Sequence, residues 1–209
     1  MSKPIIIYVP GLLSTGYLHS LSLKARMFFL RRGYEFRVVH ASPAGSIEER
    51  SEPIKQLIKQ AYFDRESSKI IHIVSHSMAC LSSRYYLSQH YNCFVKTCTM
   101  ISGPHHGSIF ADKYVKDPIL KPDDNDFEQA YKQLTSIYLE HWNQLYPDNP
   151  QVKYFSLGFT NDVMVTPESA RWGTYLGTGD CSHLMQTSPW FGGQFSKTFQ
   201  IVLDNLDSL

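Results

Sequence analysis

The sequence lacks a long hydrophobic run, an excess of charge and a large number of cysteines, and each absence excludes a class of protein. No apolar run approaches the roughly 20 residues that a membrane-spanning helix needs, and the run over residues 5–9 is too short for a signal-peptide core. A net charge of +1, from 20 Lys and Arg against 19 Asp and Glu, argues against a nucleic-acid binder. We therefore expect a cytoplasmic protein, with export by a signal-less route left open. The cysteines are too few for a disulfide scaffold, and without a secretion signal we expect thiols at Cys80, Cys93, Cys98 and Cys181.

The remaining composition is that of one folded domain. A chain of 209 residues with 43% apolar side chains buries roughly 70% of its unfolded surface. Runs of β-branched residues predict strands over residues 5–9, 35–40, 69–74, 94–101 and 151–157, and apolar residues at helical spacing predict helices over 18–30, 47–63, 78–90 and 195–206. Strands that alternate with helices predict an α/β fold, with a mostly parallel sheet of about six strands covered by helices on both faces.

One segment, residues 112–150, interrupts this alternation. It begins polar and rich in Asp, and continues as a helical apolar stripe of Phe127, Tyr131, Leu134, Ile137, Tyr138 and Trp142. Two interpretations are open at this stage. The segment is either one more sheet-covering helix with a long loop, or a flap inserted over a binding site, because long insertions in compact domains are often functional.

The junction around Ser77 carries the clearest chemical signal. A buried strand runs directly into Ser75-His76-Ser77-Met78-Ala79 and then into a helix, which is the arrangement of a nucleophile elbow. Small residues are needed two positions before and after the nucleophile, because strand and helix backbones nearly touch there, and Ser75 and Ala79 are small. The free amide of Met78 at the helix start would then face an oxyanion. The alternative is that Ser77 only caps the helix.

A second oxyanion donor is expected in the loop after the first strand. In an open α/β sheet, loops at the carboxyl ends of strands lie beside the ligand crevice. Gly11 allows the backbone to turn beneath a substrate carbonyl, so the amide of Leu12 becomes the candidate donor. A plain turn without this role is the alternative.

A serine nucleophile needs a histidine base, and His183 is the best candidate among nine histidines. It lies in a late loop just before the closing helix, where the order serine, acid, histidine places the base. His105 and His106 follow a strand at the correct sheet edge and remain rivals. Five of the remaining six histidines are assigned to the elbow, the core, or packing and surface positions: His76, His72, His19, His90 and His141.

The acid that orients the base is expected after the penultimate strand, where Asp162 stands. Asp180, three residues before His183, is the main rival. A close neighbour in one loop cannot easily reach the far nitrogen of the imidazole. The sequence therefore predicts a triad of Ser77, His183 and Asp162.

These motifs resemble those of the α/β-hydrolase superfamily, most closely its bacterial triacylglycerol-lipase and serine-esterase branch. The matching segments span nearly the whole chain and keep the family order: residues 4–12 resemble the first strand and oxyanion loop, 74–80 the Gly-His-Ser-x-Gly elbow, 101–108 the Gly-Thr-Pro-His-x-Gly-Ser turn, Asn161-Asp162 the Asn-Asp-Gly acid loop and His183-Leu184 the catalytic His-Leu. Pro10 replaces the family's His, and Ser75 and Ala79 replace glycines.

The resemblance implies a single α/β-hydrolase domain that cleaves carboxylic esters through an acyl-enzyme and needs no cofactor. Met185 stands where calcium-dependent members carry an acid, so no structural calcium is expected. The implied partner is a small-molecule or lipid ester, with transient contact to a membrane surface left open. An acyltransferase or thioesterase with the same triad, and a catalytically silent binding module, are the alternative functions.

Overall fold

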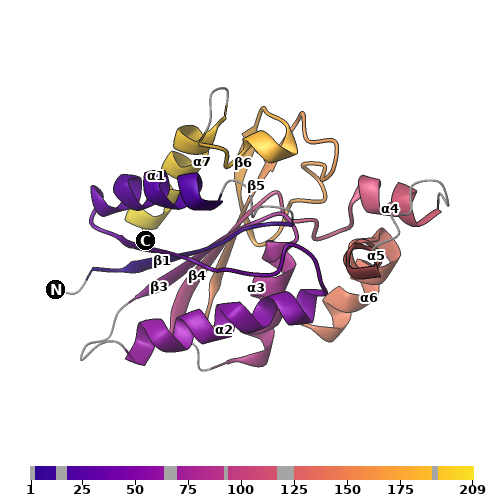
Figure 1. The fold of residues 1–209 in the computed structure, drawn as a ribbon, viewed down its shortest axis with the longest axis horizontal. Coiled ribbons are helices and arrows are strands. Elements are labelled where there is room, and N and C mark those ends of the chain that lie inside the picture. Colours follow the sequence, from indigo (N-terminus) through magenta and orange to yellow (C-terminus); the bar gives the residue numbers. More distant parts are fainter. Residues whose placement is uncertain (1–2, 13–17, 64–69, 92–93, 117–124, 190–192) are drawn as a thin grey trace.

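A single six-stranded sheet forms the centre of the protein (Figure 1). The computed structural model describes residues 3–12, 18–63, 70–91, 94–116, 125–189 and 193–209. The strands lie in the order β2-β1-β3-β4-β5-β6, and every neighbouring pair is parallel. Their bounds are β1 Ile5–Val9, β2 Glu35–Val38, β3 Ile71–His76, β4 Val95–Ile101, β5 Lys153–Phe159 and β6 Thr174–Gly179.

Helices cover both faces of the sheet, which confirms the predicted fold class. Figure 1 shows α2 and α3 on one face and α1 and α7 on the other. The helix bounds are α1 Leu18–Leu30, α2 Ile47–Phe63, α3 Ala79–Gln89, α4 Ile109–Lys116, α5 Asn125–Gln133, α6 Ser136–Leu145 and α7 Phe195–Asp207. The start of α2 is set by a capping box, in which Ser46 and Glu49 exchange backbone-to-side-chain hydrogen bonds of 2.8 and 3.1 Å.

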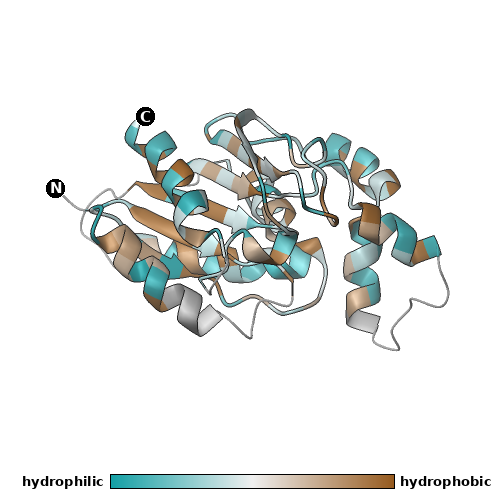
Figure 2. Cartoon of the chain, turned by 90° about the horizontal axis from the view of Figure 1, so that it is seen from above, coloured by the Kyte–Doolittle hydropathy of each residue, from teal (hydrophilic) through white to brown (hydrophobic). Residues whose placement is uncertain are grey.

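The continuous apolar strands divide their side chains between two cores, because successive residues of a strand point to opposite faces. Ile5 and Ile7 of β1 pack on the face of α2 and α3. Ile6 and Tyr8 pack on the face of α1 and α7. Figure 2 shows this hydrophobic interior within the sheet and hydrophilic colour on outward parts of the helices. In the described ranges, no helix is long and apolar enough to cross a bilayer.

The structure corrects several predicted boundaries. Strand β3 continues to His76, because Ser75 and His76 still pair with β4. Strand β5 lies two residues later than predicted, and β2 ends at Val38 rather than at residue 40. Strand β6 (Thr174–Gly179) was not predicted individually, since its sequence has no β-branched run and only half-buried or exposed positions.

The segment 112–150 contributes two helices where one stripe was predicted. Helix α5 ends at Gln133 and α6 begins at Ser136, with the Thr135 hydroxyl accepting a capping hydrogen bond from the amide of Tyr138 at 3.4 Å. Together with α4 they form the cap helices (α4–α6), which lie beyond the carboxyl ends of the strands rather than on a sheet face (Figures 1 and 2). Asp123 and Asp124 lie outside the described residues.

The cap helices are held by a hydrophobic cluster of their own. The cluster joins the cap to the starts of α2 and α3, and its buried members are Ile47, Met78, Leu81, Ala111, Ala130, Leu134, Leu139 and Trp142. Met78, beside the predicted nucleophile, is therefore covered by residues of the cap.

Candidate active site

The turn between β3 and α3 holds Ser77 in a conformation that L-residues rarely adopt. Its φ is +59°, in the left-handed region, and such a residue costs about 1–3 kcal/mol. The amide of Ser77 donates to the carbonyl of Ile101 at 2.9 Å, which fixes the turn to β4. Helix α3 has Met78 at its N-cap without a side-chain capping bond, so the capping interpretation of Ser77 is wrong.

The hydroxyl of Ser77 instead faces a histidine. Ser77 Oγ lies 2.8 Å from His183 Nε2, and His183 Nδ1 lies 2.7 Å from Asp162 Oδ2. His183 begins a short 3-10 helix (His183–Met185), and Asp162 follows β5. Both side chains are buried. The structure thus brings together the three residues that the sequence singled out, in one hydrogen-bonded row.

The carboxylate of Asp162 accepts hydrogen bonds from two sides. The amides of Met164 and Val165 donate to Oδ1, each at 2.9 Å. Burial alone would raise the pKa of Asp162, but hydrogen bonds from His183, Val165 and Gln186 lower the pKa to about 2. Asp162 is therefore ionised at neutral pH, so His183 Nδ1 carries the proton and Nε2 accepts from Ser77.

Two residues around the acid were not assigned to the site from sequence. The amide nitrogen of Gln186 donates to Asp162 Oδ2 at 2.7 Å, and its oxygen lies 3.0 Å from His76 Nε2. The rings of His76 and His183 lie side by side, with centroids 4.8 Å apart. Burial lowers the pKa of His76 to about 3, so its imidazole is neutral. The only sequence feature that could have pointed to Gln186 as a site residue was a polar side chain three residues after His183.

The predicted oxyanion loop is tied down by a buried arginine. Arg50 of α2 donates to the carbonyl of Pro10 at 2.9 Å and also to the carbonyl of Ser42. Its side chain is 1% exposed, and burial lowers its pKa to about 10. Among the described residues no carboxylate pairs with Arg50, so backbone carbonyls solvate its charge. Leu12 follows Pro10 and Gly11 and lines the same cavity as Ser77.

That cavity measures about 320 Å³ and has mostly apolar walls. Ser77 and His183 lie in its wall, and Phe110 of α4, Tyr131 of α5 and Leu134, which follows α5, line it from the cap. Its remaining lining residues are Leu12, His76, Pro104, Ser108, Met164, Val165 and Leu184. The cap therefore forms one side of the space beside the predicted nucleophile.

The rival acid and bases lie elsewhere. His105 is buried against Arg84, with His105 Nδ1 3.3 Å from a guanidinium nitrogen, and His106 is exposed. Asp180 is exposed and accepts hydrogen bonds from Thr160 and Asn161. His72 is a core residue as expected, with Nδ1 2.8 Å from the Thr97 hydroxyl.

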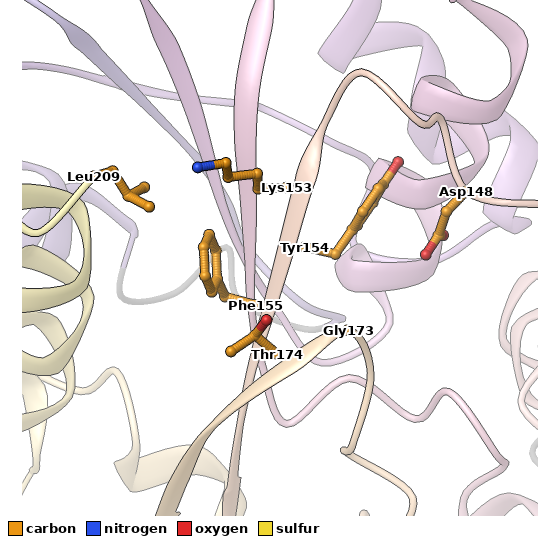
Figure 3. Close-up of a pocket in the computed structure, with 7 residues that line it drawn as sticks. All are labelled: Asp148, Lys153, Tyr154, Phe155, Gly173, Thr174 and Leu209. Atoms are coloured by element: carbon orange, nitrogen blue, oxygen red, sulfur yellow. The ribbon is translucent and has the colours of Figure 1, made fainter.

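A second hollow, of about 500 Å³, lies at the opposite edge of the sheet, at the amino ends of β5 and β6 (Figure 3). Its lining residues are Asp148, Lys153, Tyr154, Phe155, Gly173, Thr174 and Leu209. None of the predicted site residues is among them. Within the described ranges, no group of three or more His, Cys, Asp or Glu side chains is arranged to hold a metal ion.

Comparisons with known proteins show similarity to lipases and esterases. No family model matches the chain. It is 31% identical to triacylglycerol lipase 2 of Saccharomyces cerevisiae, in an alignment that covers 67% of this chain and 53% of that protein. The chain thus spans about half the length of this curated relative.

Solved structures give the fold. A Bacillus licheniformis lipase in its mature form matches with a TM-score of 0.76 and 20% identity, over 98% of this chain and 92% of that one. A metagenomic carboxyl esterase matches with a TM-score of 0.75 and 16% identity, over 100% of this chain and 76% of that one. The chain has the α/β-hydrolase fold and is similar to lipases and esterases.

Proposed function

We propose that this protein is a serine hydrolase that cleaves carboxylic esters through an acyl-enzyme. The observation that carries the proposal is the row of hydrogen bonds from Ser77 through His183 to Asp162, at the wall of an apolar cavity. The similarity to a triacylglycerol lipase supports the same chemistry.

The reaction begins when His183 Nε2 takes the hydroxyl proton of Ser77 as Oγ attacks the ester carbonyl carbon. The carbonyl oxygen becomes an oxyanion, which the backbone amides of Leu12 and Met78 hold. His183 then gives its proton to the leaving alkoxide, and the acyl group stays on Ser77. Water then attacks the acyl carbon while His183 takes its proton, and the bond to Ser77 Oγ breaks as His183 returns that proton to Oγ and the carboxylic acid leaves. Asp162 orients the imidazole and stabilises its charged form throughout.

The acyl chain is proposed to lie in the cavity beneath the cap helices. Apolar contacts there come from Phe110, Tyr131 and Leu134, and the volume of about 320 Å³ is at the lower end of the 300–1,000 Å³ that ligand pockets usually have. Leu184 is 63% exposed although it also lines the cavity, so it lies at the mouth.

Replacing the nucleophile tests the proposal. Ser77→Ala should reduce hydrolysis of p-nitrophenyl esters by roughly 10⁴-fold or more, because no acyl-enzyme can form. Ser83→Ala is the matched control: Ser83 is a buried serine of α3 whose hydroxyl has no hydrogen-bond partner in the described part of the chain, so its activity should be unchanged.

A fluorophosphonate probe gives an independent reading of the same test. The wild type and Ser83→Ala should be labelled, and Ser77→Ala should not. Unchanged ester turnover by Ser77→Ala would refute the assignment. Thioester and alcohol acceptors in the same assay separate ester hydrolysis from thioesterase or acyltransferase activity.

A further inference from the structure

Gln186 connects the acid Asp162 to the residue that precedes the nucleophile. The Gln186 side chain is fully buried, and both ends of its amide are used. Its nitrogen donates to Asp162 Oδ2 at 2.7 Å, and its oxygen faces His76 Nε2 at 3.0 Å. Because His76 is bonded through the chain to Ser77, the contacts close a ring: Ser77, His183, Asp162, Gln186, His76.

The chemistry of the groups fixes the direction of every hydrogen bond in this ring. The ionised carboxylate of Asp162 only accepts, so Gln186 must turn its NH₂ group toward it. The amide oxygen of Gln186 then faces His76, and His76 Nε2 must carry the proton. His76 Nδ1 is left as a bare acceptor, which agrees with its having no hydrogen-bond partner among the described residues.

The reverse orientation of the amide is unfavourable. It would place the Gln186 oxygen against a carboxylate oxygen, in a buried site where unpaired polar groups are costly. Asp162 therefore sets the orientation of Gln186, and the N–H of His76 gives the amide oxygen of Gln186 a hydrogen-bond donor, so that neither end of the buried amide is left unpaired. The neutral state of His76 leaves this donor in place without adding a positive charge beside His183.

We propose that Gln186 and His76 form a positioning pair for Asp162, an inference that rests on the proposed hydrolase function. Gln186 donates to Oδ2, the same oxygen that faces His183 Nδ1, while two backbone amides donate to Oδ1. With both oxygens held, the carboxylate cannot rotate away from His183 Nδ1. The ring of His76 also packs beside that of His183 and limits its rotation.

Replacing Gln186 tests the role of the amide. Gln186→Met keeps the length of the side chain and removes both hydrogen bonds, so kcat should fall ~10- to 100-fold while KM stays within about twofold. Thr187→Val is the matched control, because Thr187 is buried next in the chain and its hydroxyl has no partner in the described ranges. A folded Gln186→Met protein with the kcat of the wild type would overturn the proposal.

Two variants of His76 test the pair without touching Gln186. His76→Phe keeps a ring beside His183 and removes the N–H group, so kcat should fall about tenfold. His76→Gln returns an amide N–H near the same position and should recover part of the loss. Equal kcat values for the two variants would contradict the role of the donor, even if Gln186→Met did not fold.

The double variant separates a coupled pair from two independent effects. If the residues act as a unit, Gln186→Met combined with His76→Phe should lose little more than the worse single variant, and additive losses would refute the pair. The two proposals fail differently. A wild type that neither hydrolyses esters nor reacts with fluorophosphonate would refute the hydrolase, whereas an active wild type with active variants would refute only the positioning pair.

Discussion

Gly11 shows how closely two segments of the candidate site approach each other at the level of single residues. A Cβ atom at this position would lie 2.8 Å from the Cβ of Ser77 and 3.2 Å from the carbonyl oxygen of His76. Real Cβ atoms essentially never approach as closely as 2.8 Å, and 3.2 Å is also tight, so any larger residue at position 11 would push Gly11 and Ser77 apart. The requirement comes from this close approach and involves no positive φ at Gly11.

We therefore expect Gly11→Ala to displace the proposed oxyanion donor at Leu12. The loss of one such donor should lower kcat about 10²- to 10³-fold in an ester hydrolysis assay. Gly33→Ala is the control: Gly33 has a φ of +86° with nothing within 4 Å, so the change costs stability, about 1 kcal/mol, but not activity. Equal kcat for Gly11→Ala and the wild type would show that the loop does not need this contact.

The residues that could be predicted are those with a local pattern. Ser77 stands in a recognisable strand-to-helix junction, and Asp162 and His183 follow it in the expected order. Arg50 and Gln186 could not be predicted, because each acts through a partner that is 40 or 110 residues away in the chain. Nothing near either residue in the sequence marks which distant group it will meet.

At the scale of elements, some side chains of the cap have two roles: they pack against other cap residues, and they line the cavity beside Ser77. Tyr131 of α5 has its ring centroid 4.3 Å from that of Tyr114 and 5.5 Å from that of Phe110, and it also lines the cavity. Leu134 belongs both to the cap cluster and to the cavity wall. The same side chains therefore hold the cap and shape the space beside Ser77.

Shortening Tyr131 should change the acyl-chain preference. Tyr131→Ala enlarges the cavity, so the ratio of kcat/KM for long over short p-nitrophenyl esters should rise by roughly tenfold, about the effect of one methylene in a fitted pocket. Ile137→Ala is the control on the neighbouring helix, because Ile137 is 80% exposed and does not line the cavity. An unchanged profile for Tyr131→Ala would argue that the acyl chain binds elsewhere.

The bounds of the helices were predicted more accurately than those of the strands, and the break between α5 and α6 was not predicted. The bounds of α1 and α2 agree with the prediction, since helical spacing persists over many residues and α2 has a capping box. Strand β6 was not identified, because Gly177 and Gly179 and its edge position leave no apolar pattern. The apolar stripe in residues 112–150 did not reveal the break at Thr135. There the Thr135 side chain forms the N-cap of α6, although the helical spacing of apolar residues continues across the break.

At the scale of the whole molecule, the free energy of unfolding should depend on pH, because the buried His72 resists protonation in the folded protein. His72 of β3 is buried, and burial lowers its pKa from 6.5 to about 4. Between these pH values the unfolded chain binds a proton at this residue and the folded protein does not. The free energy of unfolding must therefore fall as the pH falls through this window, by roughly 3 kcal/mol in total for this group.

A variant that cannot be protonated should reduce this acid sensitivity. His72→Asn keeps a polar atom near the position of Nδ1, close to the Thr97 hydroxyl. The fall in the free energy of unfolding from pH 7 to pH 4, measured with urea, should be smaller than in the wild type. His141→Asn changes an exposed histidine of α6 and should follow the wild-type curve. Parallel curves for the wild type and His72→Asn would contradict the role of His72.

The overall architecture could be predicted because alternating strands and helices have few ways to form a covered parallel sheet. The placement of the cap could not, because the stripe in residues 112–150 fits a sheet face as well as it fits the cluster around Met78. Only the three-dimensional contacts decide which surface an amphipathic helix covers.

The hydrogen bond from Arg50 to Pro10 has a consequence for the state of the candidate site before a ligand binds. If Pro10 moved outward, the guanidinium would lose one of its two carbonyl partners in the interior, where an unsolvated charge costs several kcal/mol. An outward position of Pro10 is therefore unfavourable. In the proposed reaction, the backbone around Leu12 is therefore already in place when an ester binds, and little binding energy is needed to order it.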